Sequence, residues 1–303
     1  MDHKPVLLHE VLEALDPQPG DVIIDGTMDG GGHAAAIMEK IAPNGRFLGV
    51  DLEETMIAKG QEQMANGKWP KLADAKFIHG NYADLPEILK KEKSGKADGL
   101  LLDLGFSSEQ LEQSGRGFSF GADHADEPLL MTYDDSRTPV RELLRSLKEE
   151  ELANIIFEFG GERFSRRIAK AIVERKWKKP ITTAGEFAEV VRTALPHGYE
   201  RGRIDPATRT FQAFRIYANG ELENLKTILG RLGDVVKIGG CVTIVSFHSL
   251  EDRIVKNAFR ELTKEGKAEA LYKKPVTAGE EELRENSRSR SAKLRAITIK
   301  IKD

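Results

Sequence analysis

The sequence predicts an α/β protein, in which a parallel sheet covered by helices is interrupted by a block of helices. Over the first hundred residues, short apolar runs alternate with amphipathic segments, a pattern typical of parallel strands covered on both faces. The alternation stops near Gly105 and resumes near Gly239. A glycine-rich turn, Asp25–His33, follows the first apolar run and opens a helical stretch. Such a turn lets a ligand approach the backbone and the N–H groups of a helix start.

The strands are predicted from apolar runs that end on polar residues or glycine. They cover residues 21–26, 46–51, 75–80, 97–103 and 239–246, and a late alternating run at 294–301 adds another. Helices are expected between them, over residues 33–42, 53–64, 85–91, 222–232 and 250–262. Because ligands of such sheets bind at the carboxyl ends of the strands, we expect the functional site there.

The interrupting block is predicted to be helical throughout. Its helix boundaries are indicated by capping pairs and a glycine break, namely Thr138 with Pro139, Ser146 with Glu149, Gly160 with Gly161, and Thr183 with Glu186. These signals give a discontinuous sheet domain, residues 1–114 and 209–303, and a helical insert, residues 115–208.

Composition excludes several classes of protein. The chain is 40% hydrophobic and 31% charged, as ordinary globular proteins are, and it has no apolar run of the roughly 20 residues that a membrane span needs. A signal-peptide core is missing after Met1, and a single cysteine, Cys241, excludes an internal disulfide or a cysteine-cluster metal site. We therefore expect a cytoplasmic protein with no membrane contact and no bound metal.

Basic residues gather in two places although the net charge is −3. Between Arg163 and Lys179 eight basic residues face one acid, Glu174. A second cluster near the C-terminus comprises Arg288, Arg290, Lys293 and Arg295. Such segregation is typical of a polyanion-binding face, and the alternative is a solvated helix surface.

Acidic residues at the strand ends narrow the choice of cofactor. Asp25, Asp51 and Asp103 each end a predicted strand, and Asp51, 21 residues after Gly30, suits hydrogen bonding to ribose hydroxyls. NAD and S-adenosylmethionine both carry a ribose. The turn lacks the full G-x-G-x-x-G spacing, and Asp29 within it would repel a pyrophosphate, whereas it would stabilise a sulfonium or an ammonium group. These features favour S-adenosylmethionine; the alternative for Asp25 is a turn-capping role.

Several stretches resemble one family, the MraW-type methyltransferases, which methylate the N4 amine of a cytosine in 16S ribosomal RNA near the decoding centre. The matching stretches follow one another along nearly the whole chain: residues 5–10, Asp25–Thr27, Gly31–His33, Leu101–Ser108 with Gln110, Arg116–Phe120, Gly161–Phe164, Arg167–Ile172, Pro206–Gln212, Ser246–Arg253 and Ser289–Arg295. The resemblance implies a Rossmann-like S-adenosylmethionine-dependent sheet, a helical insert that helps bind RNA, and 16S rRNA within the small ribosomal subunit as the partner. Carried over by position, the cofactor residues are Gly31, Gly32, His33, Asp51, Tyr82, Asp103 and Gln110.

Two stretches depart from the family pattern. Asp29 stands where family members usually have a glycine, and Pro128-Leu-Leu-Met-Thr132 replaces Pro-Leu-Asp-Met-Arg. The first change bears on the shape of the turn, and the second on the substrate pocket, where Asp123, Asp126, Glu127, Asp134 and Asp135 lie nearby and could compensate.

Transfer to an exocyclic amine needs an acceptor for its N–H and no covalent intermediate. Asp103 is the leading candidate, with His248 as a base or base-contacting residue; the alternative for His248 is a helix cap. Phe118 is a candidate platform for the base, and a core position is the alternative. The substrate-facing basic residues are Arg116, Arg163, Arg166, Arg167, Lys170 and Arg209.

Other functions remain as alternatives. Cytosine-C5 methylation is excluded, because Cys241 lies early in its strand and far from the strand's carboxyl end. A non-catalytic RNA-binding assembly factor that retains the fold is the main alternative. A small-molecule methyltransferase would leave the basic insert without a role, and a dehydrogenase would need a complete pyrophosphate cradle. The sequence indicates neither the oligomeric state nor any dependence on a metal.

Overall fold

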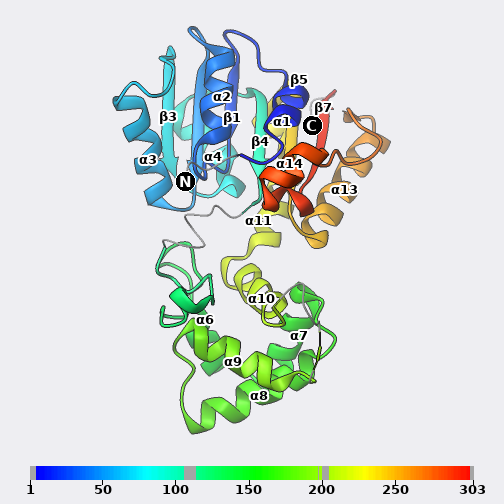
Figure 1. The fold of residues 1–303 in the computed structure, drawn as a ribbon. Coiled ribbons are helices and arrows are strands. Elements are labelled where there is room, and N and C mark those ends of the chain that lie inside the picture. The colour runs from blue at the N-terminus through cyan, green and yellow to red at the C-terminus, as the bar shows by residue number, and fades with distance from the viewer. Residues whose placement is uncertain (1–4, 106–113, 197, 200–204, 301–303) are drawn as a thin grey trace. The chain divides into compact units, whose positions relative to one another are not determined.

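The chain folds into two compact units in a computed structural model that describes residues 5–105, 114–196, 198–199 and 205–300 (Figure 1). Residues 1–107 with 222–303 form the sheet unit, and residues 108–221 form the helical unit. The second unit is longer at both ends than the insert expected at 115–208. It includes α10 (Thr208–Asn219), which sequence analysis assigned to the sheet domain, because α10 packs against α7 and α6.

The sheet unit contains one seven-stranded sheet with the order β3-β2-β1-β4-β5-β7-β6. The first five strands run parallel: β1 (Val22–Asp25), β2 (Arg46–Asp51), β3 (Asp74–His79), β4 (Ala97–Asp103) and β5 (Val236–Ser246). β7 (Lys293–Ile299) pairs antiparallel with β5 and with β6 (Ala268–Ala270). The predicted α/β class is thus confirmed.

Helices cover both faces of this sheet, as the apolar strands require. The core on one face includes side chains from α1 (Leu8–Leu15), α2 (Gly32–Ile41) and α3 (Glu54–Ala65). The core on the other face draws on α4 (Leu85–Glu92), α11 (Glu221–Leu229), α12 (Leu232–Val235) and α13 (Ser249–Lys264). Two short helices, α14 (Glu280–Glu285) and the 3-10 helix η3 (Ser287–Ser291), precede β7 in the chain.

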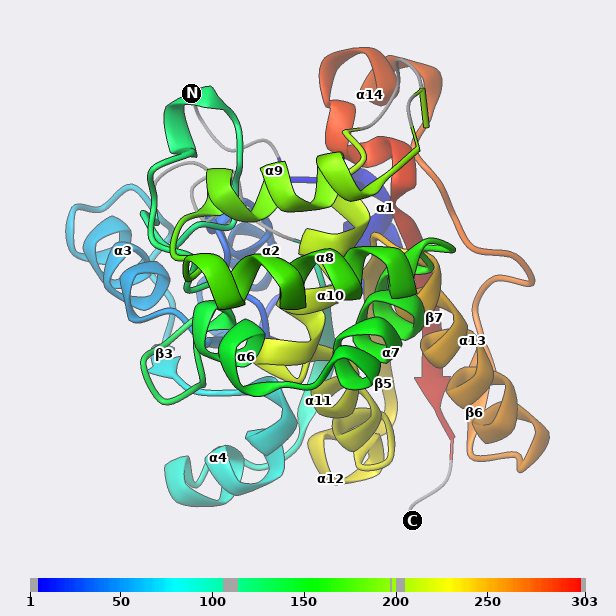
Figure 2. The same ribbon diagram turned by 90° about the horizontal axis from the view of Figure 1, so that it is seen from below.

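Within the described residues, the helical unit packs five α-helices around aromatic side chains. They are α6 (Val140–Ser146), α7 (Glu149–Gly160), α8 (Ser165–Lys178), α9 (Ala184–Ala194) and α10. Phe187 of α9 lies between Phe211 and Phe214 of α10, with ring centroids 5.0 Å and 5.5 Å away. α8 contacts α6, α7 and α9 (Figure 2). No helix among the described residues is long and apolar enough to cross a membrane.

Two predicted helix starts are corrected by the structure, and one is confirmed. α6 begins after Pro139 rather than after Thr138. The Ser146 hydroxyl donates back to the Glu142 carbonyl (2.9 Å), so Ser146 belongs to α6, and the following helix begins after Lys148. The start of α9 is as predicted, because the Thr183 hydroxyl accepts the Glu186 N–H at 3.3 Å.

Candidate functional site

Three aspartates meet at the carboxyl edge of the sheet. Asp25, Asp51 and Asp103 end the adjacent strands β1, β2 and β4, as the strand pattern predicts, and all three are buried. Bringing carboxylates together inside a protein disfavours their charged form. The pKa of Asp25 is accordingly raised well above its ordinary value, first by burial and then by the neighbouring Asp103 and Asp51, against an opposing hydrogen bond from Thr27.

Asp51 ties the glycine turn to β2. Its Oδ1 accepts the Glu53 N–H at 2.8 Å, and its Oδ2 accepts the Asp29 N–H at 3.0 Å. Burial raises the pKa of Asp51 to about 6, although both hydrogen bonds favour the carboxylate and lower it. The side chain is therefore held in one position at the end of β2.

Asp103 is fixed at the end of β4 by its backbone and by its side chain. Its N–H donates to the Thr27 hydroxyl (2.7 Å), and its Oδ1 accepts the Gly105 N–H (3.4 Å). Burial raises the pKa of Asp103 to about 7; the Gly105 hydrogen bond lowers it, Glu251 raises it and Arg288 lowers it. Near neutral pH this carboxyl can both gain and lose a proton.

His33 lies beside Asp103 in the first turn of α2. Its Nε2 is 3.0 Å from the Val6 carbonyl oxygen, and its Nδ1 is 3.5 Å from Asp103 Oδ2. A carbonyl can only accept, so Nε2 carries the proton in that contact. In the neutral ring Nδ1 then carries no proton. Nδ1 and the Asp103 carboxyl therefore attract each other only when a further proton lies on one of the two. The structure thus brings together His33 and Asp103, two residues of the predicted cofactor set.

The glycines of the turn are required by protein packing. At Gly31, where φ is +76°, a Cβ would lie 2.5 Å from the Trp69 ring, and at Gly32 it would lie 2.8 Å from Pro5. From the sequence, these glycines are expected to leave room for a ligand. At these two positions, Trp69 and Pro5 fill that room, and the N-terminal segment is thereby held against the start of α2.

Asp29 adopts a conformation that favours glycine. Its φ of +43° is left-handed, which explains on steric grounds why a glycine suits this position. Burial raises the pKa of Asp29 well above its ordinary value, and the carboxyls of Asp103, Asp51, Asp25 and Glu53 raise it further. Asp29 therefore adds a further carboxyl to an already acidic site.

Tyr82 and Gln110 are the remaining residues of the predicted cofactor set. Tyr82 follows β3 in the 3-10 helix η1 (Tyr82–Asp84), is buried, and lies close to Gly26 at the end of β1. Gln110 lies outside the described residues.

A cationic cofactor fits this edge of the sheet. Asp25 Oδ2 is buried and has no hydrogen-bond partner among the residues that the structure describes. Asp25, Asp29, Asp51 and Asp103 all have raised pKa values, so a positive group placed among them would relieve their repulsion. The sulfonium and the ammonium of S-adenosylmethionine are such groups.

His248 is a helix cap. Its Nδ1 accepts the Glu251 N–H (3.4 Å) at the start of α13, and its Nε2 lies 3.0 Å from Glu251 Oε1. The Nδ1 contact makes His248 a helix cap, the alternative named for it from the sequence, whereas the buried Nε2 makes no hydrogen bond to a described residue although Glu251 Oε1 is close. Glu251, which sequence reasoning missed, is buried and also accepts the Phe247 N–H (3.0 Å). The signal for it was its place three residues after the cap.

Cys241 is structural, as expected. The sequence places it early in its strand, but β5 begins at Val236, so Cys241 lies mid-strand, five residues before Ser246; it is buried there, and its thiol donates to the Ala14 carbonyl at 3.1 Å. Burial raises the pKa of the thiol to about 11, so it is not a nucleophile at neutral pH.

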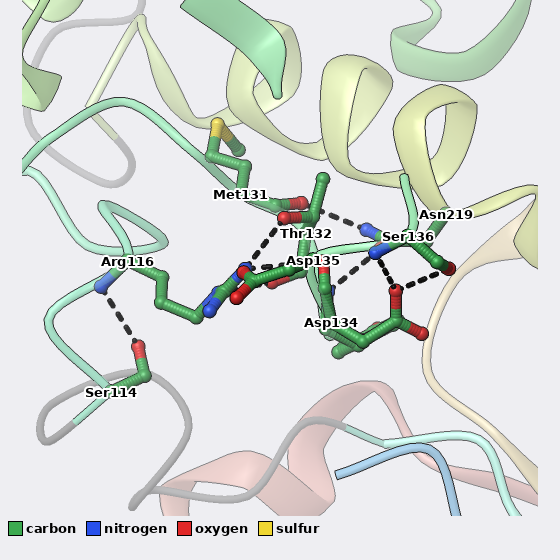
Figure 3. A network of polar contacts seen from close by, with 9 residues as sticks. Ser114, Arg116, Met131, Thr132, Asp134, Asp135, Ser136 and Asn219 are labelled. Carbon is green, nitrogen blue, oxygen red and sulfur yellow. Dashed lines mark hydrogen bonds and ion pairs between the residues drawn. The ribbon is translucent and has the colours of Figure 1, made fainter. Parts of the chain in front are cut away.

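Arg116, a predicted substrate residue, braces a loop of the helical unit (Figure 3). Its guanidinium donates to the Thr132 carbonyl (2.6 Å), the Thr132 hydroxyl (2.9 Å), the Asp134 carbonyl (3.1 Å) and the Asp135 carboxylate (2.8 Å). Asn219 of α10 holds the same loop through the Met131 carbonyl (2.9 Å) and the Tyr133 N–H (3.0 Å). Thr132, one of the departures from the family pattern, is therefore the main partner of Arg116.

Two further predicted substrate residues are engaged inside the helical unit. Phe118 is 5% exposed and stacks on Tyr133 with centroids 5.7 Å apart, so it occupies the core position named as its alternative. Arg209 Nη1 lies 3.2 Å from the Tyr199 hydroxyl and 3.8 Å from the buried carboxylate of Glu162.

The basic stripe, meaning Arg163, Arg166, Arg167 and Lys170, lies at and before the start of α8. Arg163 precedes the helix and lies over the rings of Phe164 and Tyr199, at 4.9 Å and 5.0 Å. Arg166, Arg167 and Lys170 are exposed, and Lys170 makes only a 3.9 Å contact with Glu174. These three side chains are available to phosphates. In the second basic cluster, Lys293 and Arg295 instead pair with Asp252 (3.1 and 2.8 Å).

Known proteins resemble this chain over nearly its full length. Relatives named Ribosomal RNA small subunit methyltransferase H are 43% identical in Coprothermobacter proteolyticus and 44% identical in Thermotoga neapolitana. In both, the alignment covers 98% of this chain and 96% of the relative. A solved S-adenosylmethionine-dependent methyltransferase from Aquifex aeolicus is 8% identical, with a TM-score of 0.42 over 97% of this chain and 90% of its own.

The profile of one family, described as the MraW methylase family, matches residues 1–300. The predicted methyltransferase class is therefore confirmed, and its methyl donor is S-adenosylmethionine, which the acidic edge of the sheet suits. Since the match spans nearly every residue and the relatives exceed 40% identity, the chain belongs to the MraW methylase family.

Proposed function

We propose that this protein methylates the N4 amine of a cytosine in 16S ribosomal RNA, near the decoding centre of the small subunit. The names of the relatives support ribosomal RNA of the small subunit as the substrate. The N4 atom and the decoding centre come from the family resemblance of the sequence. With its one thiol buried and uncharged, the protein suits the cytoplasm, where we place the reaction.

The observation that carries the proposal is the buried Asp103 at the carboxyl end of β4. The cytosine N4 lone pair is delocalised into the ring, so the amine is a weak nucleophile. A carboxylate that accepts one N–H orients the amine and stabilises the positive charge that develops on nitrogen. S-adenosylmethionine supplies a methyl group on a cationic sulfur. Asp103, held by Thr27 and Gly105, is in place to do this before substrate arrives.

A proton must leave the nitrogen as it gains the methyl group. Asp103 takes it, because its pKa of about 7 lets the carboxylate accept a proton at neutral pH. His33 can share this proton with Asp103, because its Nε2–H remains bonded to Val6 and its Nδ1 lies next to Asp103 Oδ2. The pair can therefore hold the released proton until solvent removes it. His248 is left out of this step, since its Nδ1 caps the start of α13 and its Nε2 lies against the carboxylate of Glu251.

The other residues of the edge bind the cofactor in this proposal. Asp51 faces the ribose, Tyr82 the adenine, and Asp25 and Asp29 the cationic groups. His33 and the backbone at Gly31 and Gly32 form the wall next to the methionine part, and Gln110 completes the predicted set. The basic stripe of α8 binds RNA phosphates, which contribute affinity without reading sequence.

Methylation of the natural particle tests the proposal. Small subunits that lack the modification are incubated with the protein and labelled S-adenosylmethionine, and their RNA is digested for nucleoside mass spectrometry. We expect N4-methylcytidine with the wild type and, over the same time, at least about 100-fold less with Asp103→Asn. Label on another nucleoside would overturn the atom assignment. No label, with cofactor binding absent in calorimetry, would instead favour the non-catalytic assembly factor.

A further inference from the structure

A groove in the helical unit combines an exposed tryptophan with a basic rim. It lies between α6 and α8, has a volume of about 660 Å³, and its floor includes the apolar side chains of Leu144, Val173 and Ile181. Trp177 on its edge is 83% exposed, more than any other large apolar side chain in the described ranges. Leaving so much aromatic surface in water is costly for a folded protein, which points to a binding role.

The groove is held open by a clamp between its two helices. Lys176 Nζ donates to the carbonyls of Leu144 (3.2 Å), Arg145 (3.3 Å) and Leu147 (2.8 Å), which end α6. A cation at a helix C-terminus satisfies carbonyls that have no partner within the helix. The distance between α6 and Trp177 is therefore set before any ligand binds, and little ordering is needed on binding.

The rim has the charge of a polyanion site. Besides the clamp residue Lys176, three basic side chains line the groove, Arg141, Arg145 and Lys148, against two acids, Glu142 and Glu149. Lys178 follows Trp177 directly and is exposed, whereas the next residue, Lys179, pairs with Glu186 at 2.7 Å. A flat aromatic ring surrounded by cations is how proteins hold single-stranded nucleic acid, with bases on the ring and phosphates on the basic side chains.

The groove is continuous with the basic stripe along one face of α8. Arg166, Lys170, Val173 and Trp177 follow each other at spacings of four, three and four residues, so they share a helix face. Trp177 follows Arg166 by eleven positions, which corresponds to a rise of about 16 Å along the helix axis. A strand whose phosphates meet Arg166 and Lys170 can thus place a base on Trp177.

We propose that this Trp177 groove is a second contact for single-stranded RNA, in which an unpaired base stacks on the Trp177 ring. The inference rests on the proposed RNA substrate and adds to it a subsite outside the methyl-transfer centre. A second copy of the chain would need the same surface and is distinguished by the test below.

Fluorescence tests the stacking directly. The chain has two tryptophans, so a Trp69→Phe background leaves Trp177 as the sole reporter. We expect a single-stranded 12-mer oligouridylate to quench this emission. In the otherwise natural protein, Trp177→Ala should weaken binding of the same RNA by roughly 5- to 100-fold, which corresponds to about 1–3 kcal/mol per stacked base. Trp177→Phe should retain most of the affinity.

Phe157→Ala is the matched control, since Phe157 is 60% exposed on α7 in the same unit and does not line the groove. Its affinity for RNA should be unchanged. Equal affinity of Trp177→Ala and wild type would overturn the proposal, and so would an effect of Trp177→Ala on self-association alone. If Trp177→Ala binds RNA with normal affinity and still methylates small subunits, the groove proposal is wrong and the proposed function stands.

Discussion

The carboxyl edge of the sheet and the exposed face of α8 both concentrate charged residues, but those of the sheet edge are buried and those of α8 are exposed to solvent. At the sheet edge, aspartates are buried, held by backbone N–H groups and hindered from ionising. On α8, Arg166 and Arg167 stay in solvent, and within the described ranges no acid pairs with them. Buried charge suits a small cation that must be positioned to within an ångström, whereas solvated charge suits a long polyanion.

The same contrast separates the predicted arginines from one another. Arg116 lies within the loop it supports, with four hydrogen bonds to Thr132, Asp134 and Asp135. Arg166 sits on a helix surface with its side chain exposed. Both were expected to contact substrate, but only the second has a guanidinium without a role in the fold. Residue type predicts the charge, and the surroundings decide its use.

The largest expected effect is at the sheet edge. Asp103→Asn removes the proton acceptor and leaves the shape, so methyl transfer should slow by about 10²–10⁴-fold. Affinity for RNA should not change. Single-turnover rates at saturating RNA and cofactor measure the loss. A rate within threefold of wild type would show that Asp103 neither accepts the amine proton nor orients the amine.

Charge reversal on α8 should lower only the affinity for RNA. Arg166→Glu with Arg167→Glu removes two phosphate contacts, so affinity should fall about 10- to 100-fold and the slope of log K against log salt should flatten by roughly 1–2. Cofactor affinity should stay the same. Lys256→Glu with Arg260→Glu on α13 makes the same charge change on exposed residues of the sheet unit. An equal loss there would mean that only net charge matters.

Arg116→Ala should weaken the fold of the helical unit more than it weakens RNA binding. Losing charge-assisted hydrogen bonds to Thr132 and Asp134 should lower the free energy of unfolding by about 2 kcal/mol. Asp135→Asn, which removes only the ion pair at a side chain that is 92% exposed, should cost less than about 0.5 kcal/mol. Denaturant titration measures both. Normal stability with lost RNA affinity would return Arg116 to the substrate-binding set.

The smallest effect is a shift of the pH profile. At limiting cofactor, where the pKa values of the free protein govern the rate, methyl transfer should rise with pH through about 7, where Asp103 loses its proton. Arg288 favours the charged carboxylate and so lowers that pKa. Arg288→Ala should therefore move the midpoint to higher pH, whereas Arg284→Ala, at an exposed position on α14, should not. A midpoint moved to lower pH would contradict the arrangement.

Sequence reasoning located most of the sheet because the strands carry their own signal. Buried parallel strands are continuous apolar runs, and β2 and β4 were predicted with the observed bounds. α10 was missed because it lies inside the helical unit: Thr210, Phe211, Ala213, Phe214 and Ile216 are all buried. A helix covered on several sides lacks the one-sided apolar pattern by which surface helices are found.

The site was predictable as a set of acids, and less so in its details. Strand ends fix where Asp25, Asp51 and Asp103 lie, so their meeting follows from topology alone. The packing of Trp69 on Gly31 and of Pro5 on Gly32 depends on segments distant in sequence, and so does the contact between His33 and Val6. Side-chain partners of this kind cannot be derived from local patterns.

Calorimetry of S-adenosylmethionine binding near pH 6.5 tests the central claim most directly. If the cation enters a site where Asp51 and Asp103 have raised pKa values of about 6 and about 7, it must lower both pKa values and release protons. Titrations in two buffers of different ionisation enthalpy measure that release. We predict binding with a net release of protons that Asp103→Asn reduces. Binding without proton release, or no binding at all, would contradict the account.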